Sequence, residues 1–287
     1  MILVTGANGK FGRAIIKNLV ANGAHVAAFE LQESSRKDLQ DLGVEKVFIG
    51  DLRNYEDEKN AYADMEVVYH ICSGFNPDEI EMGEIAIQAA IDTNLPHLMF
   101  HSVLHSINSD MPHHNKKHIV EEKLISSGIP YTIIQPCCLM QNLQGYFEDV
   151  RSKGVFRQNY LTSGGKRLCF ADVEDIGEAI AKILMEHENH IGATYELCGS
   201  KNVTLDDVCA IFSKVLGKPV HGECFSEDYL VDLLTKGGKS EYYISSALKM
   251  FRHYDADGFI GNPYTLKSLL GREPKGFEEF IREKMQG

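Results

Sequence analysis

The chain opens, after its first methionine, with Ile2-Leu3-Val4-Thr5-Gly6-Ala7-Asn8-Gly9-Lys10-Phe11-Gly12, where glycines recur as G-x-x-G-x-x-G. Residues 2–4 are typical of a buried strand, and residues 11–20 carry apolar side chains at helical spacing. A glycine turn between strand and helix turns the N–H groups of the helix start toward a ligand, and their partial positive charge suits a pyrophosphate. A purely structural turn is the alternative. The predicted dinucleotide site comprises Thr5, Gly6, Asn8, Gly9, Lys10, Phe11 and Gly12.

Short apolar runs alternate with amphipathic stretches through the first half of the chain. Six runs are expected to form buried strands: residues 2–4, 26–29, 47–49, 67–69, 98–100 and 131–134. Segments with helical spacing, such as residues 84–91, lie between them. This alternation predicts an α/β fold, with a doubly wound parallel sheet of the Rossmann type covered by helices on both faces.

The pattern changes after Pro136, where residues 139–168 carry weak strand signals and several glycines. A helix is expected from Asp172, which is a candidate N-cap, and a further strand at residues 193–198. Thr204 begins another capped helix. We therefore expect a dinucleotide-binding domain at residues 1–138 and a smaller, mostly helical C-terminal substrate lobe at residues 139–287, with residues 172–198 packing back on the Rossmann sheet.

Composition narrows the classes of partner. The 287 residues carry a formal net charge of -12, which would repel a nucleic-acid backbone. The apolar runs are far shorter than the roughly 20 residues needed to cross a bilayer. We expect a cytoplasmic protein that binds neither nucleic acid nor membrane. The seven cysteines are scattered without a C-x-x-C pattern, so they are interpreted as buried free thiols rather than as a zinc site.

The cofactor class follows from residues beyond the glycine turn. Glu30 ends the second expected strand, where a carboxylate accepts hydrogen bonds from ribose hydroxyls and repels a 2′-phosphate, which favours NAD over NADP. Residues 34–37, Ser-Ser-Arg-Lys, offer the alternative of a phosphate site and thus NADP. Asp51 follows the third strand and is expected at the adenine edge, with a helix cap or turn as its alternative.

Polar residues follow the fourth and fifth expected strands. The carboxyl ends of parallel strands converge on one edge of a sheet, so Ser73 and Gly74 are expected to contact the cofactor. Ser102 is positioned to polarise a substrate carbonyl, because a hydroxyl donates to a developing oxyanion. Capping of a loop is its alternative role.

Three stretches together resemble the NmrA-like family of atypical short-chain dehydrogenases/reductases: the glycine turn, the Gly50-Asp51 pair and the run from Val120 to Pro136, which reads Val-Glu-Glu-Lys-Leu-Ile-Ser-Ser-Gly-Ile-Pro-Tyr-Thr-Ile-Ile-Gln-Pro. The resemblance continues to Met140-Gln141-Asn142 and Leu270-Gly271-Arg272-Glu273-Pro274, and so covers nearly the whole chain. The family includes reductases of quinones, dyes and phenolic compounds, and also dinucleotide sensors that regulate a partner protein. Its NADP-preferring members usually carry a basic residue just after the second strand, whereas this chain has Glu30-Leu31.

The resemblance also suggests the catalytic residues. Aligning on the Val-Glu-Glu run puts Lys117 at the position of the lysine in the Tyr-x-x-x-Lys pair of ordinary short-chain dehydrogenases, and His113 at the tyrosine position. Lys117 is expected to bind the nicotinamide ribose and to help His113 or water deliver a proton. The adjacent Lys116 is the alternative if the alignment is displaced by one residue.

Histidines are concentrated between residues 97 and 118. No H-E-x-x-H pattern occurs among them, so no metal is predicted. His105 and His114 are expected to line a polar substrate pocket. Met140 and Phe147 are expected to hold a flat substrate, with packing of the smaller lobe as their alternative role.

These observations predict an NAD(P)H-dependent oxidoreductase that transfers hydride to a small aromatic, quinone or carbonyl substrate. The alternative is a non-catalytic NAD(P) sensor with a regulatory protein partner. Either reading is compatible with a homodimer.

Overall fold

The computed structural model describes residues 1–162 and 164–286, and the chain divides into two compact units. Unit 1 comprises Met1–Ser109, His113–Pro136 and Val173–Glu196. Unit 2 comprises Asp110–Pro112, Cys137–Asp172 and the residues from Leu197 onward. The division thus falls at Pro136, two residues before the expected boundary at 138, and most of the 172–198 segment groups with the first unit.

Unit 1 is built on a seven-stranded sheet with the strand order β10-β6-β5-β4-β1-β2-β3. Its strands are β1 (Ile2–Thr5), β2 (Val26–Glu30), β3 (Lys46–Ile49), β4 (Val67–His70), β5 (Leu98–His101), β6 (Tyr131–Pro136) and β10 (Thr194–Leu197). Strand β1 pairs in parallel with both β2 and β4, and the parallel pairing continues to β3 on one side and to β6 on the other. The strand order therefore reverses next to β1, where doubly wound sheets bind ligands. The predicted α/β class and parallel sheet are confirmed.

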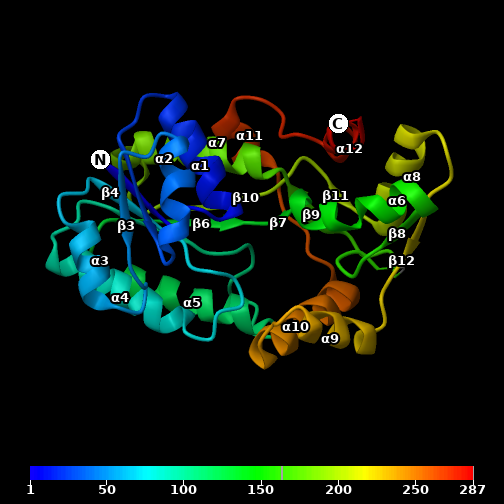
Figure 1. The fold of residues 1–287 in the computed structure, drawn as a ribbon, viewed down its shortest axis with the longest axis horizontal. Coiled ribbons are helices and arrows are strands. Elements are labelled where there is room, and N and C mark those ends of the chain that lie inside the picture. Colours follow the sequence, from blue (N-terminus) through cyan, green and yellow to red (C-terminus); the bar gives the residue numbers. More distant parts are fainter. Residues whose placement is uncertain (163, 287) are drawn as a thin grey trace. The chain divides into compact units, whose positions relative to one another are not determined.

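Helices cover both faces of this sheet, as Figure 1 shows. One face carries α1 (Lys10–Ala21), α2 (Arg36–Asp41) and α7 (Val173–Met185), and the other carries α3 (Tyr55–Tyr62), α4 (Glu79–Asp92) and α5 (Pro112–Ser126). Helices α1 and α7 pack closely, because a Cβ on Gly177 would lie 2.7 Å from that of Ala14. The apolar core between sheet and helices includes Leu3, Val68 and Phe100. The first half of the chain therefore presents its strand ends on a rigid scaffold.

Unit 2 is mostly helical. Its helices are α6 (Phe147–Lys153), α8 (Leu205–Leu216), α9 (Glu227–Lys236), α10 (Glu241–Asp257), α11 (Tyr264–Leu270) and α12 (Phe277–Gln286). Strands β11 (Asn202–Val203), β9 (Leu168–Ala171) and β7 (Cys138–Leu139) form one small sheet, and β12 (His221–Glu223) pairs with β8 (Val155–Arg157). Helix α8 has the expected start, since Thr204 and Asp207 form a reciprocal capping box. Among the described residues, no helix is long and apolar enough to cross a membrane.

Candidate functional site

The glycine turn leaves β1 and enters α1 in the geometry that an anion site needs. Gly6 has a φ of 54°, in the left-handed region that favours glycine. A Cβ on Gly12 would lie 2.5 Å from the carbonyl oxygens of both Gly6 and Ala7, so only glycine lets the helix pass so close to the turn. The N-cap of α1 is Gly9, which has no side chain that could accept from the first N–H groups of the helix. The first turn of α1 holds no acidic residue. The positive end of the helix therefore carries no anionic side chain of its own.

Thr5 anchors this turn to the neighbouring strand. Its hydroxyl donates to the carbonyl oxygen of Ile71 at 2.9 Å and accepts from the N–H of Ile71 at 2.7 Å, in a fully buried position. The hydroxyl is thus engaged with backbone, and Thr5 holds the ends of β1 and β4 together. Phe11 packs edge-on against His101 with ring centroids 4.4 Å apart, while Lys10 extends its side chain at the surface.

Glu30 reaches back from the end of β2 to the glycine turn. Its Oε1 accepts from the backbone N–H of Asn8 at 2.6 Å, which fixes a half-buried carboxylate beside the turn. The Asn8 side chain donates to Ser35 Oγ at 3.1 Å and accepts from the guanidinium of Arg13 at 2.8 Å. Arg13, which the sequence analysis did not single out, therefore brings a positive charge to the same rim.

The basic residues proposed as the phosphate-binding alternative have acidic neighbours. The Arg36 guanidinium donates twice to Glu33 and once to the carbonyl oxygen of Val47, and Lys37 donates to Asp41 at 2.6 Å. Both basic side chains would have to exchange these contacts to reach a phosphate.

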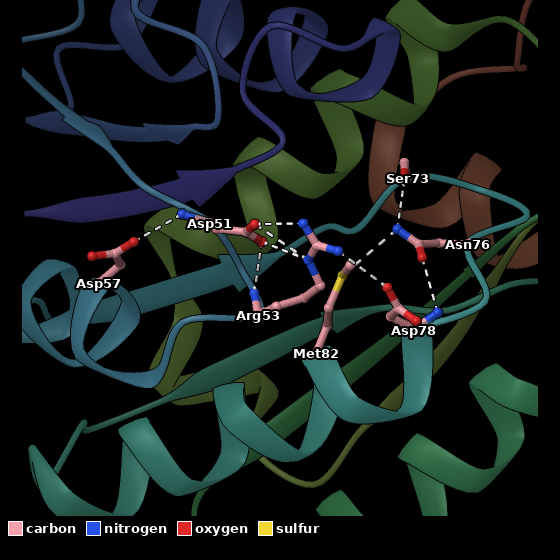
Figure 2. Close-up of polar contacts among 7 residues, drawn as sticks. All are labelled: Asp51, Arg53, Asp57, Ser73, Asn76, Asp78 and Met82. Atoms are coloured by element: carbon pink, nitrogen blue, oxygen red, sulfur yellow. Dashed lines mark hydrogen bonds and ion pairs between the residues drawn. The ribbon is translucent and has the colours of Figure 1, made fainter.

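Asp51 lies in a charged cluster after β3, drawn in Figure 2. Its carboxylate accepts from Nε and Nη2 of Arg53 and from the backbone N–H of the same residue, and its own N–H donates to Asp57 at 3.0 Å. The Arg53 contact lowers the pKa of Asp51, so the carboxylate is ionised at neutral pH. Arg53 also reaches Asp78, 3.4 Å away at the start of α4. The cluster thus connects the loops that follow β3 and β4.

Ser73 and Gly74 lie in the exposed loop after β4. Asn76 donates to Ser73 Oγ at 3.2 Å and accepts from the N–H of Asp78 at 2.9 Å, which braces the loop against α4 (Figure 2). Phe75, which follows Gly74, adopts a φ of 55°, and His105 in the loop after β5 has the same value. Left-handed backbone at non-glycine residues is costly and concentrates at functional sites.

Lys117 lies buried beneath these loops. Its Nζ forms an ion pair with Glu79, the first residue of α4, and donates to the carbonyl oxygen of His101 at 2.9 Å. Burial is the largest influence and would lower the pKa of Lys117, but the charge of Glu79, the hydrogen bond to it and the charges of neighbouring groups such as Glu121 together outweigh burial, so the pKa is raised. Lys117 is therefore a fixed positive charge at the end of β5. The neighbouring Lys116 turns away and donates to the carbonyl oxygen of Pro77 at 2.7 Å.

Ser102 is also buried, and its hydroxyl donates to Glu121. Ser106 donates to the same carboxylate at 2.7 Å, and the side-chain amide of Gln135 donates to it at 2.8 Å. Since a hydroxyl carries one proton, Ser102 must give up Glu121 before it can donate to a substrate.

His113 is buried against aromatic neighbours. Its ring lies 4.3 Å from that of Phe75 and 4.4 Å from that of His114, measured between centroids, and Nδ1 has no hydrogen-bond partner among the described residues. Burial, together with the charges of His114 and Lys117, lowers the pKa of His113 to about 2. The imidazole is therefore neutral at physiological pH. His114 interacts in turn with the backbone carbonyl oxygen of His105, at 3.2 Å from Nδ1.

Met140 and Phe147 belong to unit 2, where both side chains are buried. Phe147 packs edge-on against Phe212 and Phe280, with centroids 5.0 and 6.2 Å away. In this arrangement both side chains pack the interior of the unit, which is the alternative role that the sequence left open.

Sequence reasoning missed Glu79, Glu121, Arg53 and Arg13. In the sequence, Glu79 has the pattern of an ordinary acidic residue that stabilises the first turn of a helix. Glu121, in the run Val120-Glu121-Glu122, has the pattern of an exposed residue on a helix surface. Neither position carries a signal that would reveal its buried partner. Arg53 lies two residues after Asp51, and this proximity was the one usable clue.

Comparison with known proteins is consistent with this geometry. The profile of the NmrA-like family matches residues 1–281. An NAD(P)H azoreductase of Xenophilus azovorans is 24% identical over 284 residues, which cover 98% of this chain and 97% of the relative. The NADPH complex of an Escherichia coli NADPH-dependent quinone oxidoreductase superposes with a TM-score of 0.86 at 23% identity, over 99% of this chain and 100% of that chain.

A negative transcriptional regulator, NmrA, has the same fold, with a TM-score of 0.78 at 20% identity over 98% of this chain and 94% of that chain. The resemblance noted in the sequence is confirmed over almost its full length, and this chain belongs to the NmrA-like family.

Proposed function

We propose that this chain is an NAD(P)H-dependent oxidoreductase that transfers hydride to a small aromatic, quinone or carbonyl substrate. The observation that carries the proposal is the turn between β1 and α1. There Gly6 is left-handed, Gly12 has no room for a side chain, and the helix begins without an acidic residue. Such a turn fits a pyrophosphate, whose charge the helix start would stabilise. The full-length similarity to an azoreductase supports a reductive reaction on a flat aromatic compound.

Within this proposal the cofactor is NAD(H). The carboxylate of Glu30 is held beside the turn by the N–H of Asn8, where it could accept from ribose hydroxyls and would repel a 2′-phosphate. The acidic neighbours of Arg36 and Lys37 support the same choice. Asp51 and the Ser73-Gly74 loop would bind the adenosine and the nicotinamide side, respectively.

The bound cofactor would supply the hydride, and the protein would supply position and charge. Lys117 would orient the nicotinamide ribose, and its raised pKa keeps it charged. The low pKa of His113 disfavours an imidazolium donor, so we assign the accompanying proton to solvent, with the neutral His113 ring as a hydrogen-bonding partner. Ser102 would polarise a substrate oxygen after exchanging its bond to Glu121.

Calorimetric titration with NADH and NADPH, followed by anaerobic turnover against quinones, aldehydes and an azo dye, tests the proposal. NADH is expected to bind more tightly and to be consumed. The double variant Glu79→Gln/Lys117→Met removes both buried charges together and should lower kcat about 10- to 100-fold, because the ribose is no longer oriented. Lys116→Met, which removes the neighbouring charge, should leave kcat within about twofold of wild type.

Two other results of these experiments would contradict the proposed reductase. Tight binding of both oxidised and reduced cofactor without turnover on any substrate would contradict the reductase and favour a dinucleotide sensor with a protein partner. An absence of binding would contradict both functions.

A further inference from the structure

Three cysteines that are far apart in the sequence converge in unit 2. The sulfur atoms of Cys137, Cys169 and Cys198 all lie within 4.8 Å of one another, and all three residues are buried. Cys137 follows β6, Cys169 lies within β9 and Cys198 follows β10. Three of the seven scattered cysteines therefore form a cluster, here called the three-sulfur cluster. Among the described residues it is the one group of three or more cysteine, histidine or acidic side chains that could share an ion.

Backbone, rather than side chains, forms one wall of this cluster. A Cβ on Gly261 would collide with the sulfur of Cys198 and lie 3.2 Å from that of Cys169. Gly261 is held in place by Asn202, which donates to its carbonyl oxygen at 3.0 Å and accepts from its N–H at 2.9 Å. Asn202 also pairs across the small sheet with Cys169. The small sheet thus fixes both the sulfur of Cys169 and, through Asn202, the position of Gly261 beside it.

The spacing of the three sulfurs suits a single three-coordinate ion. Three sulfurs bound to one ion at about 2.3 Å lie at most about 4.0 Å apart, and closer still when the ion sits above their plane, as pyramidal trivalent arsenic does. The observed sulfurs, which lie within 4.8 Å of one another, would therefore have to move together on binding. Structural zinc sites require four ligands, and no fourth joins this group within the described residues. Soft ions that prefer thiolate ligands are therefore the candidates.

Charge selects among these ions. All three cysteines are buried, so the surrounding interior disfavours any uncompensated charge on a bound ion. Three thiolates around a monovalent or divalent ion would leave a net negative charge in this apolar interior, at a high desolvation cost. Three thiolates around a trivalent ion leave none. We propose that the three-sulfur cluster is a binding site for trivalent arsenic, taken up as uncharged arsenous acid.

The binding reaction is balanced without an added reagent. Arsenous acid exchanges its three hydroxyl groups for the three thiols, so three As–O and three S–H bonds break while three As–S bonds form. Each thiol proton leaves with one hydroxyl group as water, giving three waters in total. No atom is oxidised or reduced, and both the arsenous acid that enters and the complex that forms are uncharged.

Uptake of arsenite by the reduced full-length protein under nitrogen tests the site directly. Native mass spectrometry should show one arsenic per chain, and X-ray absorption at the arsenic edge should show three sulfur neighbours. Cys137→Ala, Cys169→Ala and Cys198→Ala should each lose the bound arsenic at one equivalent. Cys209→Ala, a buried cysteine of α8 outside the cluster, should retain it.

Gly261→Ala provides a variant that keeps every thiol. Its new methyl group would intrude between the sulfurs of Cys198 and Cys169, so arsenic binding should weaken, while Gly145→Ala, where the Cβ meets nothing within 4 Å, should bind as wild type does. Arsenite is also added during refolding, so that slow entry into a buried site cannot conceal binding. Absence of arsenic after both treatments, retention in the three cluster variants, or preferential binding of Zn²⁺ or Cu(I) would each overturn the proposal.

Discussion

The substitution Glu30→Gln tests how the protein distinguishes its two possible cofactors. Glu30 Oε1 accepts from the N–H of Asn8 at 2.6 Å, and glutamine retains an oxygen that can accept the same bond. The substitution therefore removes one negative charge while preserving the local geometry. The affinity for NADPH should rise, because the 2′-phosphate would no longer face a carboxylate.

The size of the effect follows from the separation of the charges. Two unit charges about 4 Å apart repel by about 1 kcal/mol in water and about 4 kcal/mol near a protein surface. For the half-buried Glu30 we take about 1–3 kcal/mol, or about 5- to 150-fold in the Kd of NADPH. NADH should bind about fivefold more weakly, since its ribose loses a charge-assisted hydrogen bond worth about 1 kcal/mol more than a neutral one.

The measurement is the ratio of the Kd for NADPH to the Kd for NADH, obtained by calorimetry at low and at high salt. Glu188→Gln is the matched control, because it makes the same charge change at an exposed residue of the short 3₁₀ helix His187–His190. The effect of Glu30→Gln should shrink at high salt, as screening weakens the repulsion. If Glu30→Gln changes the ratio no more than Glu188→Gln does, the carboxylate does not face the 2′ position and the argument for NAD fails.

Three further substitutions probe the same unit. Gly12→Ala would place a methyl group 2.5 Å from two carbonyl oxygens of the turn, so it should abolish cofactor binding in calorimetry and cost about 1–3 kcal/mol in urea unfolding; unchanged binding would contradict the tight-turn argument. The pKa of His113 is about 2 in the folded protein and about 6.5 in the unfolded chain, so only the unfolded chain takes up a proton below pH 6.5 and acid favours unfolding. Between pH 7.5 and 5.5, wild type should therefore lose about 1.4 kcal/mol relative to His113→Phe, whereas a constant difference would refute the burial of a neutral imidazole. Glu79→Gln should cost about 3–5 kcal/mol and lower the pKa of Lys117, so that turnover is lost at a lower pH than in wild type, while Glu84→Gln at an exposed ion pair should cost less than about 1 kcal/mol.

Local sequence was sufficient for the fold because each element carries its own signal. The strand, glycine turn and helix at the start of the chain are consecutive, and the pairing of Thr204 with Asp207 at the start of α8 spans three residues. The region between residues 139 and 168 was harder to predict. It holds a 3₁₀ helix at Met140–Tyr146, the seven-residue α6 and three-residue β8, which are too short for a periodicity to emerge.

The site residues likewise fall into those that local sequence predicts and those that only tertiary packing brings together. Glu30 was expected at the end of the second strand as a ribose-binding carboxylate, and the structure places it at that strand end, where it also accepts from Asn8 of the glycine turn. The partner of Lys117 could not be inferred, since Glu79 lies 38 positions earlier and is brought close only by the packing of α4 against α5. Convergence of this kind depends on how helices pack on the sheet, which no local pattern encodes.

The cysteines show the limit of spacing rules most clearly. A metal site is recognised in sequence when its ligands are close together, as in C-x-x-C, because one turn then delivers two sulfurs to one point. Here Cys137 and Cys198 follow the ends of β6 and β10, Cys169 comes from within β9, and Gly261 supplies the space beside them. Parallel sheets bring distant residues together at strand ends as a matter of topology. A chain whose dispersed cysteines lie in or just after strands can therefore hold a thiol cluster without showing any of the usual ligand spacings.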